Sequence, residues 1–520
     1  MAAGLYLFHP PGRLELVLSH AISFAVYIGS LFAFEYFLRQ LTSVLDEQFP
    51  SGQKRLPVRR IFLIAAYLAF IGSTAGLVGL VGPDVLVAVL VYLLSAMLLQ
   101  SSRQRVGPAF CAAFGGLIGL CWLTKAAMLP IGLATLPMLA ISLRKRRRAI
   151  MPLLCTLAAL AVVCLPFLVA IRITKGHWTL GKAGMLTYSW EVGGVKRFFH
   201  WQGGPGDQFG RPLHPTRQIS ASPPAYEFST PLPVTYAPWF DPAQWHEGIR
   251  VHFDPVRQAR AFGINFGIAL ILLVATPGVI PAAVVWWRGD FVRLRAWWRM
   301  TAGAWVLCLT SILLYSCVFV EPRYIGGMLA VMSCLLLGPA LLGPPSSIPG
   351  GRWFTAWCTV PCVWFYGRPL LLAVAILVFE ATGMEPYENM GWKEAKCMQS
   401  IGVRPGDGIA VIGSGFNAYW ARLAGVRVVA EIPVDYEKRL NLAHSARPVL
   451  TSINTFWSAS PERQQELLSA FARAGARWVV AEPIPMGVSV PNGWTQLPLM
   501  KVLEDGSDRK SPVFVRRLGS

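Results

Sequence analysis

The sequence predicts a polytopic α-helical membrane protein that carries a C-terminal soluble α/β domain of Rossmann-like fold. Two observations support this prediction. First, 54% of the 520 residues are apolar and only 14% are charged, whereas about 25% of the residues of a typical soluble protein are charged. Second, the mean hydropathy is +0.48, and from about residue 382 the composition becomes that of a soluble protein. We therefore expect a transmembrane domain over 1–381 and a soluble domain over 382–520.

Ten apolar stretches are candidates for membrane-spanning helices. A hydrocarbon core about 30 Å thick needs about 20 apolar residues in helical conformation. The candidates lie near 14–37, 61–81, 84–101, 107–124, 126–143, 150–172, 262–287, 300–320, 325–343 and 353–381. The last stretch contains Arg368 and is longer than one crossing requires, so it is either one span or two shorter pieces.

Basic clusters follow alternate spans and predict the orientation of the chain. They comprise Lys54, Arg55, Arg59 and Arg60; Arg103 and Arg105; Arg144 to Arg148; and Arg288, Arg293, Arg295 and Arg299. Lys and Arg collect in short cytoplasmic loops of membrane proteins. This bias also accounts for the net charge of +20, so no nucleic-acid partner is expected. We expect the other span ends, the long loop at 173–261 and, if 353–381 crosses once, the soluble domain to be extracytoplasmic.

The loop at 173–261 is long and rich in aromatic residues. Loops of this length are usually functional or disordered, and the aromatic content argues against disorder. The aromatic residues include Trp178, Tyr188, Trp190, Trp201, Tyr226, Tyr236, Trp239 and Trp245. Such rings suit the membrane interface or stacking on a sugar, and both interpretations remain open here.

The C-terminal region alternates between predicted strands and helices. Strands are expected at 409–412, 426–432 and 477–480, and helices at 416–423 and from the Ser460-Pro461 pair to Gly475. Pro in the first turn is typical of a helix start. Alternation of this kind favours a small parallel sheet.

A glycine pattern follows the first of these strands. Gly413, Gly415 and Ala418 match the G-x-G-x-x-A form of a dinucleotide-binding loop, and Glu431 ends the next strand, where a ribose-binding acid would lie. The pattern is short, however, and the bulky Tyr419-Trp420 pair is unfavourable where a helix meets a pyrophosphate. We therefore expect no nucleotide and a structural or lid-like role for this domain.

Four charged residues stand at the predicted extracytoplasmic ends of spans. They are Asp84, Lys125, Glu321 and Arg323. Charged side chains at membrane depth are costly and are therefore candidates for function. The cations would neutralise the phosphate of a lipid headgroup, and a carboxylate would hold a divalent metal or accept a proton. For each residue alone, an interfacial salt bridge or a snorkelling anchor is an equally good interpretation.

Several short motifs occur around these residues. They are Pro83-Asp84 at a span mouth, the small-residue-rich span 116–125 that ends on Lys125, the Leu165-Pro166-Phe167 helix end before the long loop, and the Glu321-Pro322-Arg323-Tyr324 turn. Together with the run of spans, they resemble the GT-C integral-membrane glycosyltransferases of the aminoarabinose-transferase and protein-mannosyltransferase type. The resemblance covers roughly residues 1–380.

The resemblance implies transfer of a sugar from a polyprenyl-phosphate donor to an acceptor on the extracytoplasmic face, often with a divalent metal. The expected partners are thus a lipid-linked sugar donor and membrane lipid. By this resemblance Lys125 and Arg323 bind donor phosphate, Glu321 orients Arg323, and Asp84 binds a metal or the acceptor.

The start of the chain departs from the family. These enzymes carry a catalytic acid in a first extracytoplasmic loop, whereas no Asp or Glu precedes Glu15 here. Either the start is incomplete, or the protein is a non-catalytic relative or scaffold, and no catalytic residue is identified. A transporter or flippase is less favoured, because no internal repeat is evident and the charges gather at one face.

Overall fold

The chain divides into two compact units in the computed structural model. The first is built mainly from Ser19–Gly184 and Pro255–Met384, and the second from Ala2–Leu18, Met185–Asp254 and Glu385–Ser520. The structure describes residues 12–48, 56–74, 77, 82–143, 150–195, 208–213, 216–228, 246–276, 279, 291–338, 390–415, 418–438, 446–485, 492–502 and 510–518.

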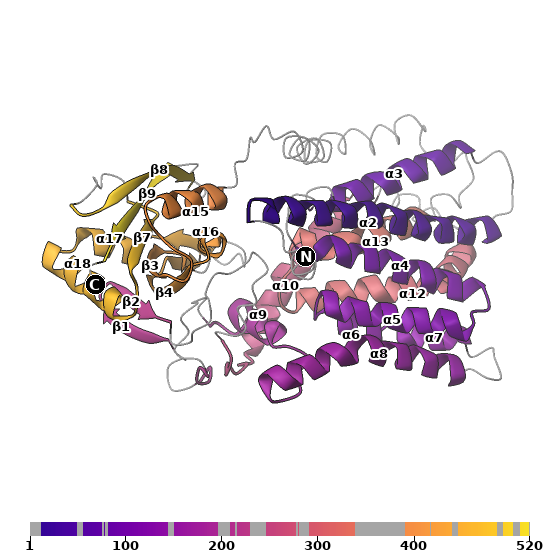
Figure 1. The fold of residues 1–520 in the computed structure, drawn as a ribbon. Helices are drawn as coiled ribbons and strands as arrows, with labels where there is room; N and C mark the ends of the chain where they lie inside the picture. Colours follow the sequence, from indigo (N-terminus) through magenta and orange to yellow (C-terminus); the bar gives the residue numbers. More distant parts are fainter. Residues whose placement is uncertain are drawn as a thin grey trace. The chain divides into compact units, whose positions relative to one another are not determined.

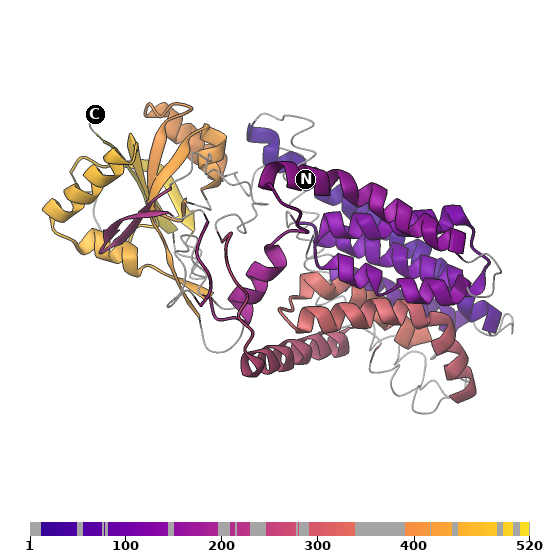
Figure 2. The ribbon, with the colours of Figure 1, turned by 90° about the horizontal axis from the view of Figure 1, so that it is seen from below.

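The first unit is a bundle of helices that run side by side (Figures 1 and 2). They are α2 (Gly12–Gln48, which begins in the second unit), α3 (Leu56–Thr74), α4 (Asp84–Arg103), α5 (Pro108–Thr124), α6 (Met128–Leu133), α7 (Leu136–Leu143), α8 (Ile150–Lys175), α10 (Pro255–Ala275), α12 (Phe291–Ser316) and α13 (Pro322–Leu337). In their described residues, all the predicted spans but the last are mainly helical, and the fifth is divided between α6 and α7. The last, 353–381, lies outside the described residues.

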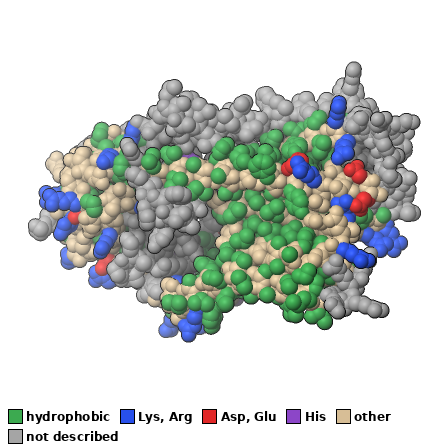
Figure 3. Space-filling view, turned by 45° about the vertical axis from the view of Figure 1, so that its right-hand side comes forward, with side chains coloured by type: hydrophobic (Ala, Val, Ile, Leu, Met, Phe, Trp, Pro, Cys, Tyr) green, Lys and Arg blue, Asp and Glu red, His purple; other side chains and the backbone are tan. Residues whose placement is uncertain are grey.

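Five of the described helices are long and apolar enough to cross a membrane. Their apolar segments are Val17–Glu47, Asp84–Arg103, Ile150–Lys175, Pro255–Ala275 and Arg295–Ser316. Three further apolar helices, Pro108–Thr124, Met128–Leu143 and Pro322–Leu337, are shorter. Apolar side chains cover much of the visible face of this unit (Figure 3). A multi-pass membrane protein follows, with fewer full-length spans among the described residues than the ten stretches predicted.

Glycines bring helices of this unit into close contact. A Cβ atom added to Gly115 of α5 would lie 1.9 Å from the Thr156 carbonyl oxygen of α8, and one added to Gly119 would lie 2.8 Å from Val163. Gly327 of α13 likewise faces the Ala88 backbone of α4, at 2.9 Å from the added Cβ. Small residues four apart allow membrane helices to pack backbone against backbone, so these glycines fix the positions of α5 and α13.

The second unit contains a seven-stranded mixed sheet of order β1-β2-β4-β3-β7-β9-β8. Its strands are β1 (Arg217–Ala221), β2 (Pro224–Glu227), β3 (Gly408–Gly413), β4 (Arg427–Ile432), β7 (Trp478–Glu482), β8 (Thr495–Val502) and β9 (Lys510–Arg517), and β5 (Asp435–Lys438) and β6 (Ala446–Val449) form a separate pair. The three predicted strands are β3, β4 and β7, which pair in parallel. The other strands pair antiparallel, so the predicted parallel arrangement holds for the centre of the sheet alone.

Helices cover both faces of this sheet. They are α15 (Met390–Ser400) and α16 (Tyr419–Ala424) on one face, and α17 (Thr451–Ser458) and α18 (Pro461–Arg473) on the other. Successive side chains of β3 point to opposite faces of the sheet. Val411 packs with α15 and α16 on one face, whereas Ile412 packs with α17 and α18 on the other. Ser460 caps α18 as its sequence predicts, accepting a hydrogen bond from the Arg463 amide.

The long loop contributes a short helix and a hairpin to the second unit. The helix is α9 (Ala183–Glu191), and the hairpin is β1 with β2. β2 pairs with β4, placing Tyr226 opposite Glu431, and Arg463 of α18 donates hydrogen bonds to Ser220 and to the Ser222 carbonyl. Of the loop aromatics, Trp201, Tyr236, Trp239 and Trp245 lie outside the described residues.

Candidate functional site

The four charged residues predicted from the sequence meet at one end of the first unit. Lys125 Nζ lies 2.9 Å from Asp84 Oδ1, and Arg323 Nε lies 3.9 Å from Asp84 Oδ2. Arg323 Nε also donates a hydrogen bond to Glu321. Asp84 therefore stands between the two cations. We call these four residues the charged cluster.

Helix ends place each member of the charged cluster. Asp84 is the first residue of α4, after Pro83, and Lys125 caps the C-terminus of α5. Glu321 precedes α13, and Pro322 fixes the first helical position. An acid at a helix N-terminus and a base at a C-terminus both interact favourably with the helix dipole. The α4 and α13 N-termini also direct positive potential toward this end of the bundle.

Two tyrosines complete the site. Lys125 Nζ lies 3.3 Å from the ring centroid of Tyr324 and 5.7 Å from that of Tyr315. The Arg323 guanidinium lies 5.1 Å from the Tyr324 ring centroid. These are cation–π distances. Tyr324 was included in the turn motif without a role, and Tyr315 was not singled out; the position of Tyr315 near a span end is the signal that points to it.

Burial differs across the charged cluster. The Asp84 and Lys125 side chains are 9% and 21% exposed, whereas that of Arg323 is 41% exposed. Lys125 lies beyond the last residue of α5, and its pKa is lowered chiefly because burial removes the ammonium from water, while Asp84 acts in the opposite direction. Lys125 and Asp84 thus form the inner part of the cluster, and Arg323 lies at its rim.

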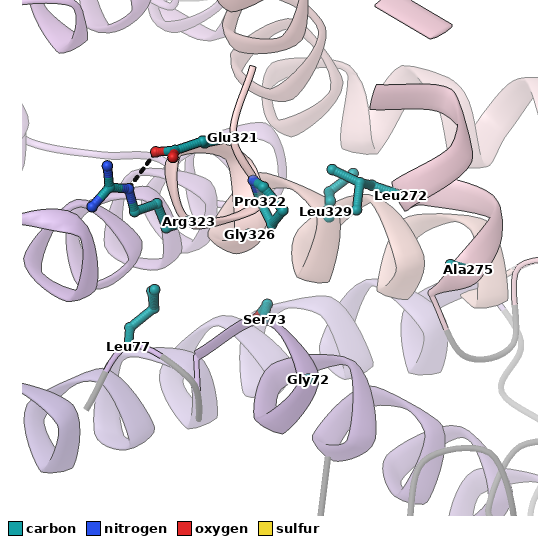
Figure 4. Close-up of a pocket in the computed structure, with 10 residues that line it drawn as sticks. All are labelled: Gly72, Ser73, Leu77, Leu272, Ala275, Glu321, Pro322, Arg323, Gly326 and Leu329. Carbon is teal, nitrogen blue, oxygen red and sulfur yellow. Dashed lines mark hydrogen bonds and ion pairs between the residues drawn. The ribbon is translucent and has the colours of Figure 1, made fainter. Parts of the chain in front are cut away.

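A cavity of about 340 Å³ opens beside the rim of the cluster (Figure 4). It is lined by Gly72 and Ser73 from the end of α3, Leu77 after that helix, Leu272 and Ala275 from α10, and Glu321, Pro322, Arg323, Gly326 and Leu329 at the start of α13. Glu321 and Arg323 give it a charged end, and the remaining walls are largely apolar. Lys125 and Asp84 do not line it. A ligand of this cavity would therefore meet Arg323 and Glu321 first.

The opposite end of α4 carries a second set of ion pairs. Arg103, in the last turn of α4, bonds to Glu47 of α2, and Arg59 of α3 lies 3.8 Å from Asp46. The 20 residues of α4 span about 30 Å at 1.5 Å per residue. The described basic residues Arg59 and Arg103 thus lie at the end away from the charged cluster, whereas Lys54, Arg55, Arg144 to Arg148 and Arg288 lie outside the described residues.

The predicted metal ligand, Asp84, is engaged by cations. Its two carboxylate oxygens face Lys125 and Arg323, so a divalent ion at Asp84 would have to displace one of them. No group of three or more His, Cys, Asp or Glu side chains that could hold a metal ion occurs among the described residues. This arrangement does not fit a metal centre.

In the glycine loop of the second unit, a carboxylate accepts a hydrogen bond from a loop amide that a nucleotide phosphate would otherwise contact. The Gly415 amide donates to Glu431 Oε2 at 2.9 Å, and a Cβ at Gly415 would lie 2.3 Å from the same oxygen. Glu482, at the end of β7, accepts a hydrogen bond from Trp420 Nε1 at 3.1 Å. The amide that would meet a pyrophosphate and the acid that would meet a ribose are therefore bonded to each other.

Comparisons with known proteins give likeness in structure only. No family model and no curated protein matches the chain. The chain is similar to the crystal structure of ArnT from Cupriavidus metallidurans in the apo state, with a TM-score of 0.43 and 13% identity over 97% of this chain and 87% of that one. It is also similar to the structure of ArnT from Cupriavidus metallidurans bound to undecaprenyl phosphate, with a TM-score of 0.39 and 13% identity over 96% and 97% of the two chains.

Proposed function

We propose that this protein is a membrane glycosyltransferase that takes a sugar from a polyprenyl-phosphate donor, with the donor phosphate held at the charged cluster. The observation that carries the proposal is the cavity beside Arg323. The cavity has a charged end and apolar walls. A lipid phosphate has a charged headgroup and an apolar chain, which match these two parts. Three of the motifs that resemble GT-C enzymes lie at the ends of the helices that carry the charged cluster, α4, α5 and α13.

Within this proposal Arg323 makes the direct contact with phosphate. Arg323 lines the cavity, and its side chain is 41% exposed. A guanidinium binds phosphate through paired hydrogen bonds. An incoming phosphate would compete with Glu321 for Arg323, and release of Glu321 would leave a carboxylate beside the ligand. The Glu321 carboxylate is then placed to orient Arg323 or to accept a hydrogen bond from an acceptor hydroxyl.

In this proposal Lys125 and Asp84 do not contact the ligand and support Arg323 instead. Asp84 holds Lys125 directly and lies near Arg323, and Lys125 packs on the Tyr324 ring. The pair carries no net charge, so its part is to hold Arg323 in position, and the N-termini of α4 and α13 add positive potential near the cavity. We assign the cluster to the extracytoplasmic face, because Arg59 and Arg103 lie at the opposite end, and basic residues favour the cytoplasm.

The experiment is a turnover assay with the purified full-length protein. A polyprenyl-phosphate sugar carrying a label in the sugar is incubated with the protein in nanodiscs, with water in place of the unidentified acceptor. Hydrolysis of the sugar–phosphate bond is followed as the release of polyprenyl phosphate and labelled sugar. We expect release in the wild type and its loss in Arg323→Gln. Arg299→Gln is a matched control, since this exposed arginine of α12 lies about 24 Å along the helix from Tyr315.

The outcomes separate the alternatives. Tight donor binding without release, in both the wild type and the control, would favour a non-catalytic relative. Movement of the intact lipid between leaflets without cleavage would favour a flippase. Equal release by the wild type and Arg323→Gln would show that the donor does not bind at this cavity.

A further inference from the structure

Five residues, 317–321, separate α12 from α13 and are not helical. Pro322 has no amide hydrogen, and in a continuous helix its ring would clash with the Val318 carbonyl. The helix therefore stops at Ser316, and a new one begins at Pro322. Within an apolar bundle, backbone groups outside helices need other hydrogen-bond partners. We call residues 317–321 the α12–α13 link.

A side chain of α10 supplies two of these partners. Asn265 Nδ2 donates a hydrogen bond to the Val318 carbonyl oxygen at 3.1 Å, and Asn265 Oδ1 accepts one from the Val320 amide at 3.2 Å. The Val318 carbonyl is the group that Pro322 would leave without a partner in a helix. Asn265 thus replaces the hydrogen bond that the proline removes.

Burial makes these two hydrogen bonds a strong constraint. Asn265 is 1% exposed, and Val320 is 0% exposed. A carboxamide is a donor and an acceptor at once, and a buried polar group that loses its hydrogen bond is costly. Gln258, two turns earlier on α10, also donates to the link, at the Cys317 carbonyl oxygen. The link is therefore held to α10 at both of its ends.

The held segment leads directly into the charged cluster. Val320 is followed by Glu321, the residue before α13, and Arg323 lies in the first turn of that helix. The same α10 forms the apolar wall of the cavity with Leu272, which lies seven residues after Asn265 and so on the same side of the helix. Figure 4 shows Leu272 and Arg323 at the cavity that they line. One helix thus provides a wall of the cavity and fixes the backbone that carries its charged end.

We propose that Asn265 is a positioning residue, which sets the place of Arg323 at the cavity by holding the α12–α13 link. Asn265 does not line the cavity, so it acts through the backbone of the link and does not touch the ligand. The inference rests on the proposed function only for the identity of that ligand, a donor phosphate.

Donor affinity tests the effect on the site. Asn265→Leu removes both hydrogen bonds at nearly constant volume, and the affinity for a polyprenyl-phosphate sugar in nanodiscs should fall roughly 2- to 12-fold, the equivalent of one neutral hydrogen bond. Trp297→Phe is the matched control. Trp297 Nε1 donates to the Leu335 carbonyl oxygen at 3.1 Å, and Leu335 lies about 20 Å along α13 from Pro322.

The control separates positioning from stability. Trp297→Phe also loses a buried hydrogen bond to the backbone of α13, so its unfolding temperature should fall, but its donor affinity should stay that of the wild type. If the two variants lose stability alike and bind the donor alike, Asn265 only stabilises the fold and the proposal is wrong.

A second measurement needs no donor. Phenylglyoxal modifies exposed guanidinium groups, and mass spectrometry follows its reaction with Arg323, with the exposed Arg299 as the reference in the same chain. A link without Asn265 should let Arg323 leave Glu321 more often, so Arg323 in Asn265→Leu should react roughly 2- to 12-fold faster than in the wild type. An unchanged Arg323 rate would overturn the positioning role. A raised rate in a protein whose wild type binds no donor would support that role and contradict the proposed function instead.

Discussion

Lys125 Nζ lies 2.9 Å from Asp84 Oδ1, across 41 residues of sequence. Each residue ends a different helix, so the pair fixes the start of α4 against the end of α5. Both side chains are largely buried, and an ion pair in such surroundings gains from mutual attraction what it loses by leaving water. If one of the two residues is removed, the other is left as a largely buried charge without its partner, which destabilises the fold.

We expect the loss of one partner of this pair to be more costly than the loss of both. Lys125→Met leaves Asp84 largely buried with Arg323 at 3.9 Å and should destabilise the protein by about 3 kcal/mol. The double variant Asp84→Asn/Lys125→Met should recover part of this loss, because no unpaired charge remains. Unfolding in detergent measures all three proteins. Additive effects in the double-mutant cycle would show that the two residues do not interact.

Arg323→Gln should weaken donor binding with little effect on stability. The guanidinium is exposed at the cavity rim, and a charge-assisted hydrogen bond contributes about 1.5–3 kcal/mol, which corresponds to roughly 10- to 150-fold in affinity. The measurement is the affinity for a polyprenyl-phosphate sugar in nanodiscs. Lys125→Met should have a smaller effect, since Lys125 does not line the cavity. Unchanged affinity in both variants would exclude these residues from the donor site.

Gly115→Val should separate α5 from α8. The added Cβ would lie 1.9 Å from the Thr156 carbonyl oxygen, and backbone cannot yield as a side chain does, so we expect a loss of about 1–3 kcal/mol. The adjacent Gly116→Ala is the control, because its Cβ would meet only Val163, at 3.9 Å. That variant should be neutral or slightly stabilising. Similar unfolding temperatures for both variants would contradict the close packing.

Full-length protein should show no saturable heat with NAD in calorimetry. The Gly415 amide is bonded to Glu431, so a pyrophosphate would have to break this hydrogen bond. The whole chain is required, because β1 and β2 of the loop pair into the same sheet. Micromolar binding that is lost in Gly415→Trp would contradict this expectation.

Reporter fusions test the orientation of the chain. A reporter after Arg148 should be cytoplasmic, because the basic cluster at 144–148 is expected there, and one at Gln208 should be extracytoplasmic. The two sites flank α8, whose 26 residues are long enough for one crossing. The same side for both reporters would show that the orientation is wrong.

Hydropathy located the helices well, because in lipid each span must satisfy its own backbone hydrogen bonds and so forms a continuous apolar stretch. The sheet was predicted less well. β3, β4 and β7 alternate with helices and were recognised, whereas β2, which pairs with β1, joins the sheet by pairing with β4 far away in the sequence. The Ser222-Pro223 turn between two short polar strands gives no strong signal of burial.

The charged cluster could be predicted because charge within an apolar chain is conspicuous. Asp84, Lys125, Glu321 and Arg323 stood out singly, and alternation of the spans placed them at one end. Their individual contacts could not be predicted, since packing decides that Lys125 turns to Tyr324 while Arg323 faces the cavity. The apolar wall from α10 was equally invisible, because Leu272 and Ala275 are ordinary residues of a span.

The pairing of Tyr226 with Glu431 has a consequence for biosynthesis. The ribosome makes the hairpin about 200 residues before β4 exists. At about 5–20 residues per second, this interval lasts roughly 10–40 s. During that time α10, α12 and α13 are inserted while β2 has one edge without its native neighbour. Completion of the sheet is thus a late event, which must follow the integration of those helices into the bilayer.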